Sequence, residues 1–171
     1  MAGRGRAVFG SVGFFLVAPG IVAGVVPCAI SRWTMVAPLL GLQLVRVIGV
    51  ALLGLGLGLL LDCFGRFAIL GRGTPAPVAA PERLVVSGPY RHVRNPMYVA
   101  VVALVLGQGL LLGQAVLLLY GSVVWLLFHA FVVLYEEPTL GRRFGPSYQT
   151  YRAAVGRWWP SLRPWTGQDP A

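Results

Sequence analysis

The chain has 171 residues, of which 57% are hydrophobic and only 11% are charged. Soluble domains carry about 25% charged residues, and disordered chains combine low hydrophobicity with high charge, so the composition excludes both classes. What remains is an integral membrane protein of one compact domain. The net charge is +9 and all 14 basic residues are arginines, so their positions must show whether they serve nucleic-acid binding or membrane orientation.

Long apolar stretches predict four membrane helices, because about 20 apolar residues cross the hydrocarbon core of a bilayer. The third stretch is short for a span, so we expect that flanking residues extend it or that it lies where the bilayer is thin. The predicted fold is an all-α polytopic membrane protein with an amphipathic C-terminal segment, forming a single domain over residues 1–171. The expected elements are helices at about 7–30, 39–69, 96–113 and 115–137, a loop at about 70–95, and an interfacial segment at 138–171.

The arginines are distributed unevenly between the predicted loops. Twelve of the 14 precede the first apolar stretch, lie between the end of the second at Leu61 and the start of the third, or follow the fourth. With four spans these three regions share one side of the membrane, and the positive-inside rule puts that side in the cytoplasm. We therefore expect both termini in the cytoplasm, in a plasma membrane of bacterial inner-membrane type. The basic charge is explained by orientation, so no nucleic-acid partner is predicted.

Two glycine pairs have the four-residue spacing that lets helix backbones approach closely in lipid. They are Gly20 with Gly24, and Gly54 with Gly58. A packing role and simple composition bias explain them equally well, and neither speaks to function.

The first segment with chemical information covers residues 87–98. Asn95 followed by Pro96 is typical of an N-cap and the first position of a helix, so the third helix is expected to start there. A helix N-terminus has free N–H groups and partial positive charge, and Arg91 and Arg94 precede it closely. Together they predict an anion site at the cytoplasmic surface. The alternative is a basic loop that touches anionic lipid headgroups.

The second segment contains two adjacent carboxylates at the predicted end of the fourth helix. Glu136 and Glu137 are two of only five acidic residues, and Pro138 is expected to end the helix directly after them. Acidic side chains are disfavoured at a helix C-terminus, so this pair indicates a site that holds a cation. The structural alternative is pairing with Arg142 and Arg143.

Topology brings the two segments together. Only Gly113 and Gln114 separate the third and fourth helices, which predicts a tight antiparallel hairpin. The start of one helix and the end of the other then lie side by side, with arginines next to glutamates. Such a pocket suits a zwitterionic ligand with an additional positive charge. The following residues 139–160 are amphipathic, aromatic and basic, which fits either an interfacial helix or a lid over the pocket.

The motif residues of both segments, taken together, resemble the isoprenylcysteine carboxyl methyltransferase family, which in turn resembles phospholipid N-methyltransferases. The resemblance covers about residues 71–160, and its specificity comes from the combination of motifs in order. The residues that carry it are Gly88-Pro89-Tyr90-Arg91, Arg94-Asn95-Pro96-Met97-Tyr98, Glu136-Glu137-Pro138, Phe144-Gly145, Tyr148, Tyr151, Arg157 and Pro160.

The resemblance implies a membrane enzyme that binds S-adenosylmethionine on the cytoplasmic side and takes a lipophilic acceptor from the bilayer. Our hypothesis is methyl transfer to a carboxylate or other nucleophile of such an acceptor, with Arg94 and Glu137 as catalytic residues. Arg91 and Arg94 would meet the methionine carboxylate, and the glutamates would hold ribose hydroxyls or the amino group. Membrane lipids are expected partners, and no metal is predicted. The expected cofactor-binding residues are Tyr90, Arg91, Asn95, Pro96, Tyr98, Glu136 and Glu137.

Two positions depart from the related families. Asn95 stands where eukaryotic isoprenylcysteine methyltransferases have histidine, so no histidine acid or base is proposed there. Ala100 stands where phospholipid methyltransferases have glycine, which disfavours that substrate class slightly. His129 is interpreted as a hydrogen-bonded structural histidine.

Two other functions are compatible with a small membrane protein. A proton-coupled transporter needs an acidic residue within a span, whereas Glu136 and Glu137 are expected at a span's end. A membrane reductase with a nicotinamide cofactor is suggested by a distant resemblance to sterol reductases. The short chain and the weak phosphate-binding signal argue against the reductase.

Overall fold

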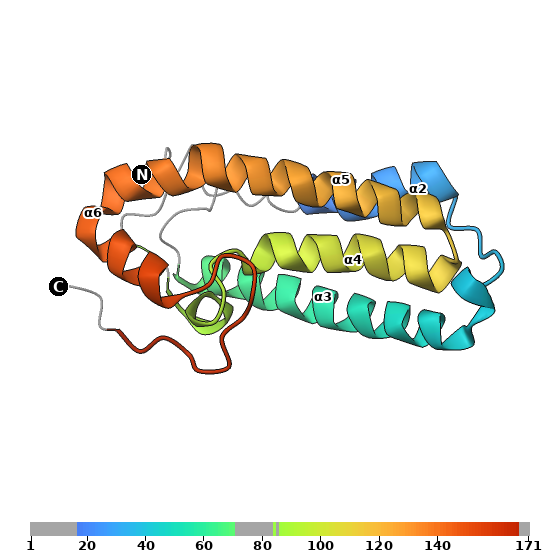
Figure 1. Cartoon of the computed structure of the whole chain (residues 1–171), viewed down its shortest axis with the longest axis horizontal. Helices are drawn as coiled ribbons and strands as arrows, with labels where there is room; N and C mark the ends of the chain where they lie inside the picture. Colours follow the sequence, from blue (N-terminus) through green and yellow to red (C-terminus); the bar gives the residue numbers. More distant parts are fainter. Residues whose placement is uncertain (1–16, 71–83, 85, 168–171) are drawn as a thin grey trace.

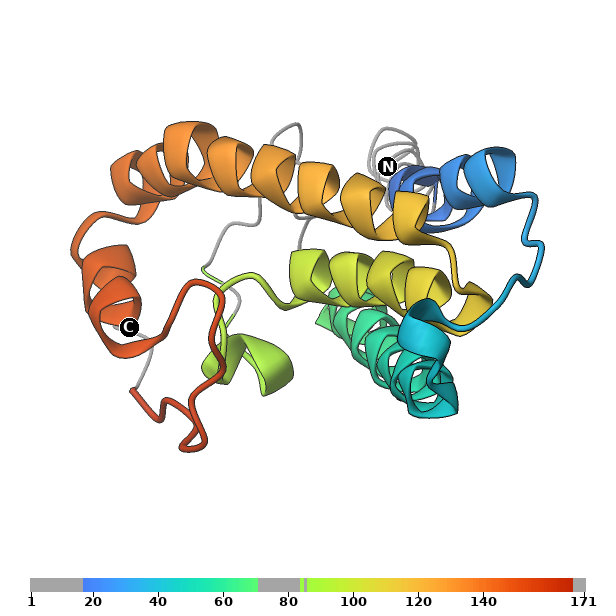
Figure 2. The same cartoon turned by 45° about the vertical axis from the view of Figure 1, so that its right-hand side comes forward.

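The computed structural model describes residues 17–70, 84 and 86–167, and this part of the chain is all-helical without a strand. Figures 1 and 2 show α4 lying between α3 and α5, with the N-terminal helix beside α5. The elements in chain order are the helix Val17–Ser31, which contains η1 (Ile21–Val25) and α2 (Val26–Ser31), then η2 (Leu39–Gly41), α3 (Gln43–Leu70), η4 (Gly88–Arg91), α4 (Pro96–Leu112), α5 (Ala115–Phe131), η5 (Val132–Glu136) and α6 (Glu137–Ala154).

Helices α3 and α4 approach each other closely at glycines. A Cβ atom on Gly49 would lie 2.6 Å from the backbone nitrogen of Leu111, and one on Gly107 would lie 2.9 Å from the carbonyl oxygen of Gly49. Small residues permit such contacts between helix backbones in lipid. A Cβ on Gly20, Gly24, Gly54 or Gly58 would have no atom of the described residues within 4 Å, so the pairs with four-residue spacing show no packing role in this part of the chain.

The connection between α4 and α5 confirms the predicted hairpin. Gly113 ends α4 with φ 76°, a left-handed conformation that glycine adopts without strain. The preceding helix end is held from outside, because the Val36 N–H donates to the Leu112 carbonyl at 2.9 Å. Two residues therefore suffice to reverse the chain.

The prediction that Pro138 ends the fourth helix was wrong. A π-helical turn, η5, follows α5, and the chain passes directly into α6 with Pro138 in its first turn. The Glu137 N–H donates to the carbonyl of Val132, five residues back, which shifts the hydrogen-bond register just before the proline. Proline is tolerated there because a first-turn residue needs no N–H partner. The direction changes only at Gly145, which has φ 52°.

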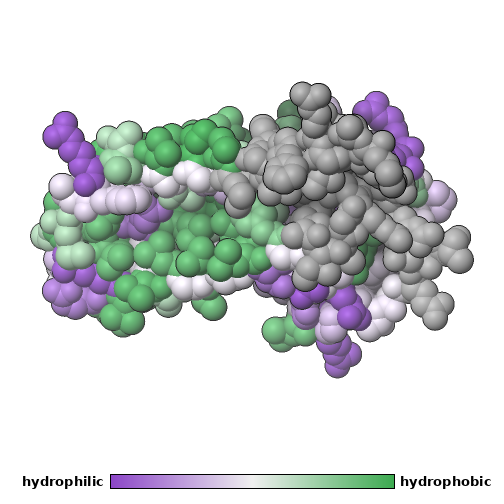
Figure 3. All heavy atoms as spheres, turned by 180° about the vertical axis from the view of Figure 1, so that it is seen from behind, coloured by the Kyte–Doolittle hydropathy of each residue, from purple (hydrophilic) through white to green (hydrophobic). Residues whose placement is uncertain are grey.

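Two helices are long and apolar enough to cross a bilayer, Gln43–Arg66 and Ala115–Ala154. In the most apolar stretches of these two helices, only 17% and 22% of the residues are buried, so most of their apolar surface faces outward. Figure 3 shows the resulting band of hydrophobic residues on one face, with hydrophilic residues at the end of the molecule. An exposed apolar surface of this extent fits lipid rather than water. The helices Val17–Ser31 and Pro96–Leu112 are also apolar but shorter.

The C-terminal segment, residues 155–167, is not helical and lies along the loop before α4 (Figure 2). Val93 and Gly156 form an isolated parallel bridge, and the Arg94 N–H donates to the Gly156 carbonyl at 2.9 Å. Further along, the Ser161 N–H donates to the His92 carbonyl at 2.9 Å. The C-terminal segment thus covers the start of α4.

Candidate active site

A buried carboxylate stands at the centre of the candidate site. Glu137 is only 6% exposed and accepts two hydrogen bonds from Arg157, with Nε at 2.6 Å from Oε1 and Nη2 at 3.0 Å from Oε2. Arg94 Nη1 lies 3.0 Å from Oε1, and the more exposed Arg152 lies 3.8 Å from Oε2. We call these four residues the Glu137 cluster. It joins the start of α4, the start of α6 and the C-terminal segment.

Arg94 has a free donor inside this cluster. Its side chain is 9% exposed, its Nη1 also donates to the Tyr148 hydroxyl at 3.3 Å, and its Nε is buried without a partner in the described part of the chain. Buried donors are rarely left unsatisfied, so this atom calls for an acceptor from a ligand. Since arginines outnumber the single glutamate, that acceptor is expected to be anionic.

The C-terminal segment supplies Arg157 and is fixed from α4. The Asn95 side-chain nitrogen donates to the Arg157 carbonyl at 3.2 Å and makes no side-chain cap on its own helix. The hydrogen bond to Glu137 raises the pKa of Arg157, so this guanidinium stays charged. Asn95 does occupy the N-cap position as predicted, yet its amide holds the C-terminal segment.

Glu136 points to a different partner from its neighbour. The Tyr98 hydroxyl donates to Glu136 Oε2 at 3.0 Å, and the Tyr98 ring lies 4.7 Å from the ring of Phe128. Glu136 is half-buried, and its described contacts contain no guanidinium. It therefore keeps acceptor capacity for a donor or a cationic group beside the Glu137 cluster.

Tyr90 and Pro96 take part in packing. Tyr90 packs against the buried cluster of Leu60, Cys63 and Met97, and its carbonyl accepts a hydrogen bond from Tyr151 at 2.6 Å. Burial raises the pKa of the Tyr90 phenol well above its ordinary value, so it stays neutral. Pro96 is fully buried at the first turn of α4. Both residues therefore contribute to the packing around the start of α4.

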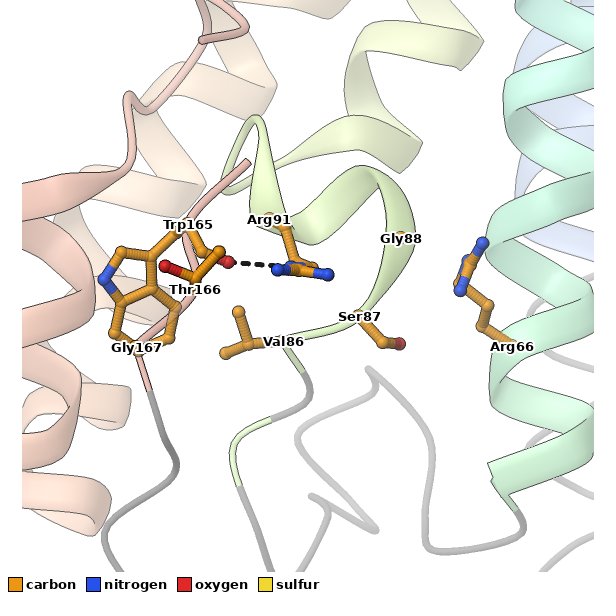
Figure 4. Close-up of a pocket in the computed structure, with 8 residues that line it drawn as sticks. All are labelled: Arg66, Val86, Ser87, Gly88, Arg91, Trp165, Thr166 and Gly167. Atoms are coloured by element: carbon orange, nitrogen blue, oxygen red, sulfur yellow. Dashed lines mark hydrogen bonds between the residues drawn. The ribbon is translucent and has the colours of Figure 1, made fainter. Parts of the chain in front are cut away.

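Arg91 is not brought to the glutamates. Its Nε donates to the Trp165 carbonyl at 2.7 Å, and the Trp165 N–H donates back to the Arg91 carbonyl at 2.9 Å. The Arg91 side chain lines a separate pocket of about 320 Å³ together with Arg66 of α3 (Figure 4). Although Arg91 and Arg94 are only three residues apart, Arg91 thus lines this pocket whereas Arg94 contacts Glu137.

An apolar groove of about 650 Å³ runs beside the site, between α3, α4 and α5. Its walls include Leu52, Val102 and Leu126, and Trp158 and Trp159 lie at its border. Trp158 directly follows Arg157, and its indole Nε1 donates to His129 Nδ1 at 3.0 Å. The groove therefore lies next to the Glu137 cluster, and His129 has the structural role expected of it.

Sequence reasoning missed three side chains of this centre: Arg152, Arg157 and Tyr148. The arginines were assigned to membrane orientation because they follow the last span. Arg157 and Tyr148 were nevertheless among the motif residues, and that was the available signal. The pairing of Glu137 with Arg157, 20 positions further along the chain, could not be read from local spacing.

Comparison with known proteins supports the motif assignment. The model of the phospholipid methyltransferase family matches residues 44–147, which include Arg94 and both glutamates. A protein-S-isoprenylcysteine O-methyltransferase of Schizosaccharomyces pombe is 41% identical over 73 residues, or 42% of this chain and 30% of that protein. The chain thus matches less than a third of the length of this relative, and no solved structure matches it significantly. The chain belongs to the phospholipid methyltransferase family, in agreement with the predicted resemblance to isoprenylcysteine methyltransferases.

Proposed function

We propose that the protein transfers the methyl group of S-adenosylmethionine to a lipophilic acceptor that reaches the site from the bilayer. Membership of the family supports a membrane methyltransferase, and the relative's name supports an acceptor with a lipid group. The observation that carries the proposal is the Nε of Arg94, which is buried without a partner among the described residues in the cluster around Glu137, the neighbour of Glu136 in sequence.

The residues fit this cofactor. The Arg94 guanidinium would bind the methionine carboxylate, since a charge-assisted hydrogen bond to a carboxylate satisfies its free Nε. Glu136, with Tyr98 at 3.0 Å, would accept from the amino group or from ribose hydroxyls. When bound, the cofactor supplies an electrophilic methyl group on a sulfonium. The adjacent acidic and basic groups match the two charges of its amino-acid end.

Glu137 is assigned a positioning role. Two arginines contact it within 3.0 Å and a third lies 3.8 Å away, so its oxygens are already occupied. A carboxylate held in this way does not readily accept a proton from an acceptor. Its function is to hold Arg94 and Arg157 in place, and orientation of reacting groups contributes several kcal/mol to catalysis. An acceptor that is itself a carboxylate needs no base.

The apolar groove would take the hydrocarbon part of the acceptor. It opens between helices whose surfaces face lipid, and its border at Trp158 is adjacent in sequence to Arg157. A chain lying in the groove would bring its polar end to the Glu137 cluster. Trp158 and Trp159 would exclude water from that junction.

Four spans with both termini in the cytoplasm remain our proposal for the topology. It adds the shorter apolar helices Val17–Ser31 and α4 to the two long ones. The excess of arginines around the candidate site supports a cytoplasmic position for it.

Binding of radiolabelled S-adenosylmethionine to the purified full chain in lipid nanodiscs tests this function. Arg94→Ala and Glu136→Ala are expected to lose binding by at least tenfold, because each removes a direct contact. Arg163→Ala is the matched control, since this arginine is exposed and lies outside the site. Undiminished binding in both site variants would contradict the assignment of Arg94 and Glu136 as cofactor-binding residues. Mass spectrometry of membrane lipids with and without the active protein would then seek an acceptor heavier by one methylene.

A further inference from the structure

The pocket that contains Arg91 is distinct from the Glu137 cluster. Figure 4 shows Arg66 reaching from α3 towards Gly88 and Arg91 lying between Gly88 and Trp165. Its lining is Arg66, Val86, Ser87, Gly88, Arg91 and residues 165–167, and its volume is about 320 Å³. We call it the outer pocket. No acidic side chain of the described residues lines it.

The polar groups of the outer pocket are incompletely paired. Arg66 uses Nε for Asp62, 3.0 Å away on its own helix, and Arg91 uses Nε for the Trp165 carbonyl. The terminal nitrogens of both guanidinium groups have no partner in the described residues. The hydroxyl oxygen of Ser87 is buried and also lacks a partner there. The guanidinium groups of Arg66 and Arg91 and the hydroxyl of Ser87 are thus available for a ligand.

Gly88 makes this arrangement possible. It has φ 52°, and a Cβ atom at this position would collide with the guanidinium group of Arg66. Arg66 therefore lies directly on the backbone of Gly88, close to the neighbouring hydroxyl of Ser87. Any other residue at position 88 would strain the turn and displace Arg66 from the pocket.

The level of the pocket in the membrane points to its ligand. The uncharged stretch of α3 from Val47 to Leu61 is followed by Asp62 and Arg66, so this arginine lies where hydrocarbon gives way to lipid headgroups. Arginine forks bind phosphate in bidentate geometry, and a serine hydroxyl adds a further donor. We propose that Arg66, Arg91 and Ser87 form a phosphate-binding site, with the headgroup phosphate of an anionic lipid as its source. The proposal does not depend on the methyl-transfer function.

Thermal unfolding of the purified full chain in neutral detergent tests the site with three probes at matched ionic strength. They are phosphatidylglycerol, oleate as an anionic lipid without phosphate, and sodium phosphate. At a tenfold excess over its Kd, phosphatidylglycerol is expected to raise the midpoint by about 3–6 °C. An equal rise with oleate would overturn the proposal, because charge alone would then suffice. An equal rise with sodium phosphate would support the site but replace the lipid by free phosphate as its ligand.

Variants separate the pocket from general charge attraction. Arg66→Gln and Ser87→Ala are expected to lose at least half of the rise, whereas the control Arg142→Gln, an exposed arginine outside the pocket, keeps it. Equal losses in all three variants would contradict the site. Native mass spectrometry counts retained phosphatidylglycerol directly, so a variant with altered stability remains informative. Displacement of this lipid by S-adenosylmethionine would assign the pocket to the cofactor and overturn the proposal.

Discussion

The Glu137 cluster and the outer pocket contain similar side chains in opposite situations. In the cluster, three arginines converge on one carboxylate that is 6% exposed. In the outer pocket, Arg66 has a half-exposed partner, Asp62, and the side chain of Arg91 has one partner among the described residues, the Trp165 carbonyl. The comparison teaches that arginine content alone does not define a role. Burial and the supply of acceptors leave one donor of the cluster, Arg94 Nε, for a ligand, whereas in the outer pocket the terminal nitrogens of both arginines are open to one.

The substitution Glu137→Gln is expected to have the largest effect. It leaves Arg94 and Arg157 around a neutral amide in a buried site, and breaking a buried charge pair from one side costs about 3–5 kcal/mol. We expect a lower thermal midpoint in detergent and faster trypsin cleavage after Arg157. Glu136→Gln is the matched control, because the described partner of Glu136 is the Tyr98 hydroxyl. Equal destabilisation by both substitutions would contradict the central role of Glu137 in stabilising the cluster.

Arg157→Lys tests whether the geometry of the cluster matters beyond its charge. Lysine keeps the positive charge but cannot reproduce the two parallel hydrogen bonds at 2.6 and 3.0 Å. Loss of charge-assisted hydrogen bonding is expected to cost about 1.5–3 kcal/mol and to weaken cofactor binding. Both are measured by thermal unfolding and radiolabelled S-adenosylmethionine binding. Full retention of both properties in the lysine variant would mean that only charge is required.

Trp158→Phe examines how the C-terminal segment is held against α5. The change removes the hydrogen bond from the indole to His129 and keeps most of the aromatic surface. The expected cost is about 0.5–1.5 kcal/mol, with faster proteolysis of the segment. Trp159→Phe is the control, since Trp159 is 86% exposed. If both variants are digested at the same rate, the hydrogen bond to His129 does not hold the segment.

The smallest effect on stability is expected in the outer pocket. Arg66→Gln removes an ion pair whose side chains are 35% and 44% exposed, and exposed pairs contribute at most about 1 kcal/mol. Raising the salt concentration should weaken phosphatidylglycerol binding here while leaving the Glu137 cluster intact. If salt affected lipid binding and the unfolding midpoint equally, the expected difference in salt sensitivity between the outer pocket and the Glu137 cluster would be contradicted.

Much of the candidate site followed from the sequence because the information is local. Gly113 and Gln114 predict the hairpin, and that hairpin brings Tyr98 to Glu136 and Arg94 to Glu137. Motif residues in order then indicated the family.

Other features depend on long-range packing and could not be predicted in this way. The π-helical turn η5 lets the helix continue through Pro138, although local rules for proline favour a break. Spacing alone does not say which face of α3 meets α4, so the packing role of Gly49 was found only in the structure. Arg157 reaches Glu137 only because the chain turns back after Ala154.

Because the chain turns back after Ala154, the cluster is completed by a residue that is synthesised after all the described helices. Arg157 is translated 20 residues after Glu137, when every helix from α3 to α6 has already been made. Until then the buried carboxylate lacks its bidentate partner, and the start of α4 is uncovered. A chain interrupted before residue 157 would contain all the described helices but no complete Glu137 cluster. Completion of the Glu137 cluster therefore requires the C-terminal segment, which is the last described part of the chain to be synthesised.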